Sequence, residues 1–368
     1  MTKAAELAKM GEVLTNSQIG GRRNIVINGG MICSQRATSA TGVGASEGYF
    51  TLDRFEVAPS TNGRATMSQS TDTPDGFSNS LKLECTTADT SIAAGEYFVL
   101  RTCFEGQDLQ QLKKGTSSAE KVTVSFYVKG NASATYTCEL SDTDNTRHNS
   151  QTFAVTTSWN RIVLTFVGDT TGALNNDNAE SLRLGFWLHS GTSYSDGTFA
   201  SNTWHTADNK RVGDGQTSFF DSTDRELFIT GIQMEIGEQA TPFEHRSFGE
   251  ELALCQRYHI HYDSNAAYGR LGLGENASTT ICQMVLSLPT EMRAVPTLVT
   301  SGAVTHYSLY NKSTITATTN VALSSTSSNS KIIFVAFTIG SANLLLGGAS
   351  QIMTNNNADY YIAYDAEL

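Results

Sequence analysis

The sequence predicts an all-β protein built from two modules. Apolar and polar residues alternate with period two along much of the chain, as at Val122, Val124, Phe126 and Val128. Clusters of Gly, Asn, Asp, Ser and Thr separate these segments and supply turns. With 368 residues and a hydrophobic content of 39%, the chain is too long for one compact core. We therefore expect two β-sandwich domains.

Residues 1–23 predict a short N-terminal helix. Ala4, Leu7, Ala8, Met10 and Leu14 recur with helical spacing. A helix of about a dozen residues is marginal alone in water, so it needs a partner surface or copies of itself. The three-then-four spacing of its larger apolar residues suits a brief trimeric seam. We interpret this segment as an anchor.

Residues 24–246 predict the first β-sandwich. The period-two alternation returns in the ranges 162–166, 182–188 and 232–236. Turn-forming clusters such as Gly168–Gly172 lie between the strands, without helical segments long enough for crossovers. Many short strands of this kind form two antiparallel sheets packed face to face, and a jelly roll is the form we expect.

Residues 247–257 predict a linker helix. Pro242 stops the preceding strand because it has no amide for a ladder. Ser247 and Glu250 have the spacing of a capping box, in which each side chain accepts a hydrogen bond from a free backbone amide. A capped helix has a defined direction, so we expect a rigid joint instead of a flexible linker.

Residues 258–368 predict a C-terminal β domain, which we expect to be a second sandwich. The ranges 259–262, 281–288, 296–299 and 332–339 alternate or are continuously apolar. The block Lys312–Lys331 is rich in Ser and Thr, but its β-branched residues from Thr314 favour a strand. The domain has four basic and six acidic residues only. Such low charge favours an oligomer that covers part of this surface.

The composition excludes several classes of partner. A net charge of -11 argues against nucleic acid, whose phosphates require a basic surface. No apolar run reaches the roughly 18 residues of a membrane span. Glu6 and Lys9 stand where a secretory peptide would be apolar, so we expect synthesis in a cytoplasm without membrane insertion. The six cysteines are scattered without a C-x-x-C pair, which favours small buried thiols.

The motifs predict no enzyme and no cofactor. The string Gly44–Gly48 matches G-x-S-x-G, but a strand-like segment follows it where a hydrolase has a helix. No phosphate-binding loop is present in the sequence. Carboxylates for glycoside hydrolysis stay an open alternative, because a sandwich can bring Asp142, Asp144 or Asp196 beside another acidic residue.

Aromatic and polar residues interleave in a predicted loop at Ser190–His205. Tyr194 and Trp204 offer ring faces for the C–H side of a sugar, while Asp196 and His205 can bond its hydroxyls. The alternative is that Trp204 closes the end of the sandwich core. Tyr307 and Tyr310 in the C-terminal β domain have the same two interpretations, sugar binding or packing in a core.

Two speculative metal sites follow from spacing. His259 and His261 stand at i and i+2 on a predicted strand, so both imidazoles face one side, and three copies would offer six nitrogens. The alternative is an exposed polar face. Asp142, Asp144 and Asn145 suggest a calcium site in a turn, without the spacing of an EF-hand.

Five strings along the chain are similar to those of phage tail fibre and related virion appendage proteins. They are Asn24–Met31 with Gln35 and Arg36, the aromatic-x-x-x-Asp-Arg-aromatic element Tyr49–Phe55, Gly231–Gly237, the joint Ala240–Tyr258 and Leu288–Pro296. Together they span most of the chain in a specific order, so the chain resembles this family. Asp53 and Arg54 in the second string are interpreted as structural charges, each with a partner elsewhere.

The resemblance implies a virion protein assembled in the host cytoplasm. It implies a jelly roll similar to carbohydrate-binding modules, a distal domain that contacts the receptor, and a homotrimer that binds host surface polysaccharide or lipopolysaccharide. Leu7, Met10 and Leu14 would then dock the chain onto other tail or head proteins. Only residues 1–23 precede the first sandwich, which favours a short appendage over a long fibre. The alternatives are a decoration or adaptor protein and a glycan depolymerase.

Overall fold

The structure, a computed structural model, describes Lys3 and residues 23–368. The predicted anchor residues Leu7, Met10 and Leu14 lie outside the described residues. The chain divides into two compact units between Glu251 and Leu252. We call them the first unit and the second unit. Among the helices in the described part of the chain, none has the length and apolar character that a membrane crossing requires.

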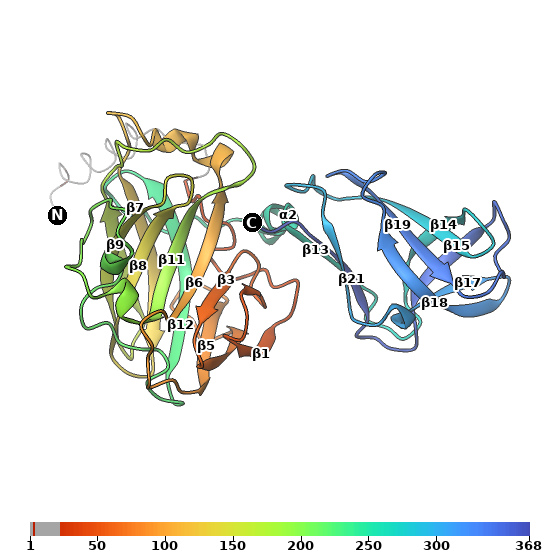
Figure 1. Cartoon of the computed structure of the whole chain (residues 1–368), viewed down its shortest axis with the longest axis horizontal. Helices are drawn as coiled ribbons and strands as arrows, with labels where there is room; N and C mark the ends of the chain where they lie inside the picture. The colour runs from red at the N-terminus through yellow and green to blue at the C-terminus, as the bar shows by residue number, and fades with distance from the viewer. Residues whose placement is uncertain (1–2, 4–22) are drawn as a thin grey trace. The chain divides into compact units, whose positions relative to one another are not determined.

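The first unit is a sandwich of two six-stranded sheets, and most of its strands are labelled in Figure 1. One sheet, which we call sheet A, has the order β1 (Ser39–Val43), β4 (Arg64–Ser70), β5 (Ser80–Thr87), β12 (Glu226–Ile236), β7 (Val122–Gly130) and β10 (Asn160–Phe166). The other, sheet B, has the order β2 (Gly48–Tyr49), β3 (Glu56–Ser60), β6 (Tyr97–Glu105), β11 (Glu180–Ser190), β8 (Ala134–Asp142) and β9 (Arg147–Val155). From β5 onward the chain passes repeatedly between the sheets, as expected of a jelly roll.

Period-two alternation places the core of the first unit between these sheets. On β7, Val124, Phe126 and Val128 are fully buried, as the sequence predicts. The Phe126 ring meets Phe186 of sheet B edge to face, with centroids 5.0 Å apart. Aromatic pairs at this spacing stabilise a core beyond the area that they bury. The all-β class and the jelly-roll sandwich are therefore confirmed.

The string from Asn24 to Gly29 forms part of the junction at the end of the first unit. The Asn24 side-chain amide donates to the carbonyl oxygen of Ile232 at 3.1 Å, and its oxygen accepts from the amide of Met234. The amide of Asn28 donates to the Glu251 carboxylate at 2.6 Å. A Cβ on Gly29 would lie 2.0 Å from the Ile232 carbonyl oxygen, so this approach requires glycine. The string is structural.

Asp53 and Arg54 are buried and paired, as expected. Arg54 donates to the carbonyl oxygen of Cys103 at 2.6 Å, and Asp53 accepts from the side chain of Gln35 at 2.9 Å. All six cysteines are also buried. Burial raises the pKa of the Cys85 and Cys282 thiols to about 11, so these groups stay protonated at neutral pH.

The joint contains one helix, α2 (Phe248–Gln256). The amide of Glu250 donates to Ser247 Oγ at 3.3 Å, and the amide of Ser247 donates to the Glu250 carboxylate at 3.1 Å. This reciprocal pair is the predicted capping box. The predicted helix and its start are confirmed.

The second unit contains a closed barrel and a separate sheet, instead of the expected second sandwich. The barrel has the order β14 (Arg270–Asn276), β15 (Ile281–Ser287), β19 (Ile332–Ile339), β18 (Thr314–Leu323), β17 (Tyr307–Asn311) and β20 (Ala349–Thr354). The three-stranded sheet has the order β13 (His259–Asp263), β21 (Tyr361–Asp365) and β16 (Thr297–Thr300). Figure 1 shows the curled barrel strands in cyan to blue.

Closure of the barrel depends on one pairing between strands that are distant in the sequence. β20 pairs with β14 through partners such as Leu273 and Gln351, and with β17 on its other side. Alternation identifies one buried face per strand, but not which strand closes the sheet. The predicted strand at Thr314 is confirmed as β18, so the Ser- and Thr-rich block belongs to the barrel wall.

Four short 3-10 turns complete the described elements. They are η1 (Gly106–Leu112), η2 (Thr192–Tyr194), η3 (Asp208–Lys210) and η4 (Val304–His306). Two of them, η2 and η3, belong to the long connection between β11 and β12, and this connection forms one wall of the candidate site.

Candidate functional site

The connection from Gly191 to Ser218, which we call the cover loop, packs on sheet B. Its backbone pairs with β9 at His148, where the amide of His148 donates to the carbonyl oxygen of His205 at 2.8 Å. Further on, the amide of Gly213 donates to Thr137 Oγ1 of β8 at 3.2 Å. Because the loop covers part of the outer face of sheet B, polar side chains there are buried.

Residues in register across sheet B form a row on this outer face. Arg101 of β6 pairs with Gly185 of β11, which pairs with Glu139 of β8. The next row contains Val99 and Trp187. Successive residues in a strand point to opposite faces, so these residues face away from the core that Leu184 and Phe186 fill. Gly185 has no side chain, which leaves a hollow between its two charged neighbours.

A cleft of about 160 Å³ opens at this hollow. Strands β6, β8 and β11 and the cover loop supply its walls. The lining residues are Tyr97, Val99, Arg101, Glu139, Ser141, Arg183, Gly185, Trp187, Tyr194 and Arg211. We call it the sheet B cleft. Three aromatic rings and three guanidinium groups therefore meet where the cover loop packs on sheet B.

The aromatic rings of the cleft form a cluster. The Trp187 ring lies 5.0 Å from Tyr194 and 6.1 Å from Tyr97, and the two tyrosine rings meet edge to face at 5.6 Å. Val99 and Val212 pack beneath them. Trp187 itself is buried, while both tyrosines are half-buried and present part of their rings to the cleft. Tryptophan thus supports the tyrosines that a ligand would touch.

A buried carboxylate, Glu139, fixes the inner wall. It accepts two hydrogen bonds from Arg211, at 2.8 and 2.7 Å, and one from the Trp187 indole at 3.0 Å. Burial alone would raise the pKa of the Glu139 carboxyl, but the Arg211 charge and its hydrogen bonds outweigh it and lower the pKa. The Arg211 guanidinium also stacks over the Trp187 ring at 4.7 Å. These contacts hold the cover loop against the sheet.

The opposite wall carries a second ion-paired arginine. Arg101 donates to the buried Glu56 at 2.7 Å and to the exposed Glu47 at 2.7 Å. A guanidinium fixed in this way loses little conformational entropy when a ligand accepts a further hydrogen bond from it. The sheet B cleft is therefore preorganised to bind hydroxyl, carboxylate or phosphate oxygens.

Histidines lie under the cover loop next to this network. Ser141 Oγ and His148 Nδ1 are 3.0 Å apart, and His148 lies 4.0 Å from Glu139. Burial lowers the pKa of His148 to about 4, so its ring is neutral at pH 7. Burial also lowers the pKa of His205. Both rings serve the packing of the loop.

The four residues predicted from Ser190–His205 do not form one site. Tyr194 lines the sheet B cleft. Asp196 is exposed at the η2 turn, and His205 packs against His148 with centroids 6.1 Å apart. Trp204 packs against the end of the core, where its indole donates to the carbonyl oxygen of Val167 at 2.8 Å. These contacts, with the Lys114 ammonium 5.0 Å from the Trp204 ring, agree with the structural alternative, and a role of Trp204 in glycan binding stays a prediction.

The residues predicted in the second unit have other contacts. Tyr307 is fully buried in the core, so the glycan interpretation is wrong for it. Tyr310 is half-buried on the barrel, with the Arg270 guanidinium 6.0 Å from its ring. His259 Nδ1 lies 3.0 Å from Asp365, and His261 Nε2 lies 3.5 Å from Asp263. The two histidines share a face, as predicted, and the suggested metal between copies stays a prediction.

Two of the acidic residues considered for hydrolysis or calcium, Asp142 and Asp144, are bound to protein groups. Asp142 is fully buried and pairs with the Lys114 ammonium. Its other oxygen accepts from the amide of Asn145 at 3.0 Å. Asp144 accepts two hydrogen bonds from Asn175, at 2.9 and 3.0 Å. A carboxylate already neutralised by a buried lysine is a poor calcium ligand, so the arrangement argues against that site.

Sequence reasoning missed most of the cleft. Tyr97, Trp187 and Arg211 come from two strands and a loop spread over more than a hundred positions. A signal was present, because Tyr97 and Arg101 alternate with the apolar Phe98 and Leu100. Such alternation places an aromatic and a cation on one outer face. Only the sheet order brings that face beside Trp187.

A second cleft in the first unit is larger, at about 510 Å³. Phe77, Phe243 and His245 line it, with ring centroids 4.9 to 5.2 Å apart. Its walls come mainly from loops and from the start of α2, whereas strands supply most of the sheet B cleft. Sites on strands hold their geometry better, which favours the sheet B cleft as the binding site.

Comparisons with known proteins give structural likeness only. No family model matches the chain, and no curated protein matches it in sequence. The structure is similar to a family 11 carbohydrate-binding module from Clostridium thermocellum in complex with a mixed-linked tetrasaccharide. Identity is 11%, the TM-score is 0.29, and the match covers 55% of this chain and 98% of that one.

Two further solved structures show comparable likeness. The N-terminal cellulose-binding domain of Cellulomonas fimi β-1,4-glucanase C is 12% identical, with a TM-score of 0.28, over 56% of this chain and 100% of that one. The enzymatically active domain of tailspike protein 4 of bacteriophage CBA120 is 11% identical, with a TM-score of 0.29, over 58% of this chain and 21% of that one. Scores this low carry no argument about ligand or activity, so function rests on the site itself.

Proposed function

We propose that this protein is a virion appendage protein of a phage that binds host cell-surface glycan in the sheet B cleft, without chemical turnover. The observation that carries the proposal is the meeting of Tyr97 and Arg101 of sheet B with Tyr194 and Arg211 of the cover loop in one cleft. Aromatic faces cover the C–H side of a sugar ring, and fixed guanidinium groups donate to its oxygens.

The guanidinium groups of the cleft suit the oxygens of an acidic polysaccharide or lipopolysaccharide. Three arginines line it, and each is held in place by an ion pair, Arg101 with Glu56, Arg183 with Glu180 and Arg211 with Glu139. Arginine forks match carboxylate and phosphate oxygens in pairs. A guanidinium has five N–H groups, so those that the carboxylates do not use would donate to ligand oxygens. We therefore expect anionic groups on the preferred ligand.

The proposed protein acts as a homotrimer. The barrel of the second unit exposes large apolar side chains, including Leu273, Val285 and Ile315. Val285 stands opposite Phe334 on the neighbouring strand, so apolar side chains lie side by side on the outer wall. Copies of this chain would bury such a surface. Three weak sites on one particle then raise avidity by about 10²–10⁴ over a single site.

The direct test is binding of purified full-length protein to host cells. We expect labelled protein to bind them and to compete with phage adsorption, and extracted surface polysaccharide to block both effects. An absence of cell binding together with unchanged adsorption would overturn the proposal. Incubation with the polysaccharide should release no fragments, and fragment release would instead support a depolymerase.

The second candidate is a decoration or adaptor protein of the phage head or tail. The exposed apolar barrel wall favours it, because such a surface also fits a neighbouring virion protein. Antibody labelling of intact particles under the electron microscope separates the two candidates. A receptor-binding protein should project where the particle meets its host. Uniform labelling of the head would support decoration.

A further inference from the structure

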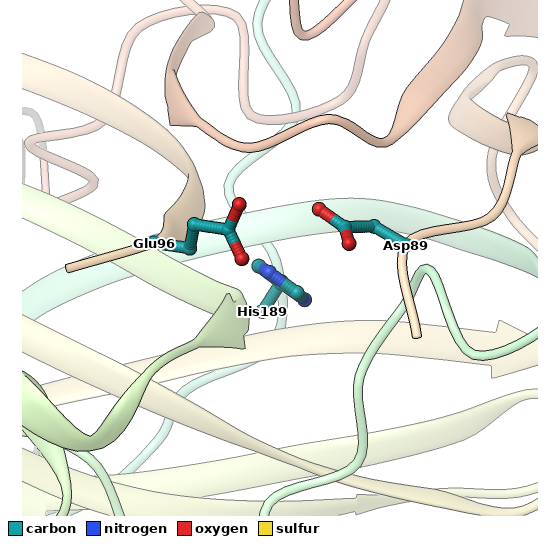
Figure 2. Close-up of side chains that lie close together, drawn as sticks. All are labelled: Asp89, Glu96 and His189. Carbon is teal, nitrogen blue, oxygen red and sulfur yellow. The ribbon is translucent and has the colours of Figure 1, made fainter. Parts of the chain in front are cut away.

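Three potential metal ligands converge at one end of the sandwich, outside the sheet B cleft. Asp89 lies two residues beyond β5, Glu96 directly precedes β6, and His189 lies near the end of β11. Their ligand atoms all lie within 4.8 Å of one another, and all three residues are buried. In Figure 2 the two carboxylates point toward each other, with the imidazole between them.

A bulge in β11 places the histidine in this cluster. Trp187 pairs with Val99, but the next pair joins His189 to Phe98, so Leu188 is the extra residue. Without the bulge, alternation would put His189 on the outer face with Trp187. With it, the imidazole turns to the core side and packs against the Phe220 ring at 5.5 Å. Bulges often re-aim a side chain at a functional site.

The imidazole has one partnered and one unpartnered nitrogen. His189 Nδ1 lies 2.8 Å from Ser218 Oγ. The whole His189 side chain is buried, and its Nε2 atom forms no hydrogen bond. An unsatisfied buried polar atom is costly. A hydrogen bond at the other ring nitrogen is the usual way in which proteins orient a histidine ligand.

Neighbouring groups also hold both carboxylates in place. Asp89 Oδ2 accepts from Thr61 Oγ1 at 2.8 Å and from the amide of Asn62 at 2.9 Å. Glu96 accepts from the amide of Ala93 at 2.6 Å and from the Asn62 side chain at 3.2 Å. These donors are neutral, so they leave the two negative charges uncompensated. A bound dication would neutralise both.

We propose that Asp89, Glu96 and His189 bind a divalent transition metal ion of the zinc class. One imidazole nitrogen and two carboxylate oxygens form a mixed set that suits Zn²⁺, whereas Ca²⁺ and Mg²⁺ prefer oxygen ligands alone. Residues 90–95 between the two carboxylates are exposed and give access to the site.

The ion would tie the β5–β6 connection to the start of the cover loop. The amide of Gly191 donates to the carbonyl oxygen of Glu96 at 2.7 Å, and Tyr97 of the sheet B cleft directly follows Glu96. Metal binding would therefore order the edge from which Tyr97 and Tyr194 extend. The metal site does not depend on glycan binding, because none of its three ligands lines the cleft.

The test is calorimetric titration of chelator-treated full-length protein with ZnCl₂ and, separately, with CaCl₂. We expect one Zn²⁺ per chain from this site, a rise in Tm with Zn²⁺, and weaker Ca²⁺ binding. Glu96→Gln should weaken Zn²⁺ binding at least tenfold and abolish the Tm shift. The control, Glu238→Gln, alters an exposed carboxylate paired with Lys121 and should bind Zn²⁺ like the wild type.

The outcomes decide the proposal even if a variant is less stable. Glu96→Gln removes one of two like charges, so the metal-free variant should fold at least as well as the metal-free wild type. A wild type without Zn²⁺ binding, or a Glu96→Gln variant with unchanged Zn²⁺ affinity, overturns the site. Ca²⁺ binding equal to or tighter than Zn²⁺ binding overturns the metal class.

Discussion

The two units place their charged and apolar side chains in opposite ways. The first unit buries charged residues such as Asp53, Glu139 and Asp142, and each has partners in the interior. The second unit has few charged residues, and its barrel turns apolar side chains outward. Of the twelve large hydrophobic side chains exposed in the described part of the chain, eight lie in the second unit.

This difference indicates that the two units have different roles. A buried ionic network adds little net stability but can fix the position of the side chains that it joins. In the first unit that network positions the rings and guanidinium groups of the sheet B cleft. The second unit has an apolar outer wall instead, which favours association with copies of the chain. Recognition would thus belong to the first unit and assembly to the second.

The largest expected effect is on the stability of the first unit. Glu139→Ala leaves Arg211 largely buried without its carboxylate and should lower the free energy of unfolding by about 3 kcal/mol. All three tryptophans, Trp159, Trp187 and Trp204, lie in the first unit, so their fluorescence during urea unfolding reports this unit alone.

The matched control removes a carboxylate from the second unit. Glu291 pairs with Lys331 at 3.0 Å on the surface. Glu291→Ala should leave the unfolding transition of the second unit unchanged when it is followed by far-UV circular dichroism, because exposed ion pairs are screened by water. Equal effects of the two substitutions would remove the contrast between the units.

The first unit should also lose stability in mild acid. His148 has a folded pKa of about 4 against a usual value of 6.5, so the unfolded chain binds the proton first as the pH falls. Stability is therefore complete above pH 6.5 and is lost progressively down to about pH 4, by up to ~3 kcal/mol. Burial also lowers the pKa values of His189 and His205, so these two histidines should add to the same loss of stability in acid.

Urea midpoints at several pH values, followed by tryptophan fluorescence, measure this loss. His148→Gln keeps a polar side chain that does not titrate. It should reduce the slope of stability against pH between pH 6.5 and 4. An unchanged slope in this variant would show that His148 is not the group responsible.

The contrast between the units also separates what the sequence predicts from what it does not. Local signals were sufficient for β7, where alternation marks Val124 and Phe126 as core, and for α2, where Ser247 and Glu250 form the cap. Barrel closure was not predictable, because β14 and β20 meet across about eighty positions. The same limit applies to sites, since a bulge at Leu188 decides where His189 points.

A smaller effect concerns assembly through the second unit. Val285→Asp places a charge on the apolar outer wall of the barrel and should weaken the trimer by about 1–2 kcal/mol per copy. Light scattering after size exclusion should show a shift from trimer towards monomer at low concentration. Val163→Asp, at an equally exposed valine of the first unit, is the control and should leave the mass unchanged.

An unchanged mass in Val285→Asp would show that the trimer, if formed, uses another surface. A monomeric wild type would contradict the homotrimer itself. Either result would leave the sheet B cleft to act as a single weak site. Assembly could then no longer be assigned to the second unit.

The most direct test of the central claim is the affinity of host surface polysaccharide for full-length Tyr194→Ala and Tyr310→Ala, measured by calorimetry against the wild type. Both substitutions remove one half-buried tyrosine ring, the first from the sheet B cleft and the second from the barrel. We predict that Tyr194→Ala weakens binding about tenfold, or ~1.4 kcal/mol, and that Tyr310→Ala has no effect. Loss of binding in Tyr310→Ala with wild-type affinity in Tyr194→Ala would contradict the account and assign recognition to the second unit.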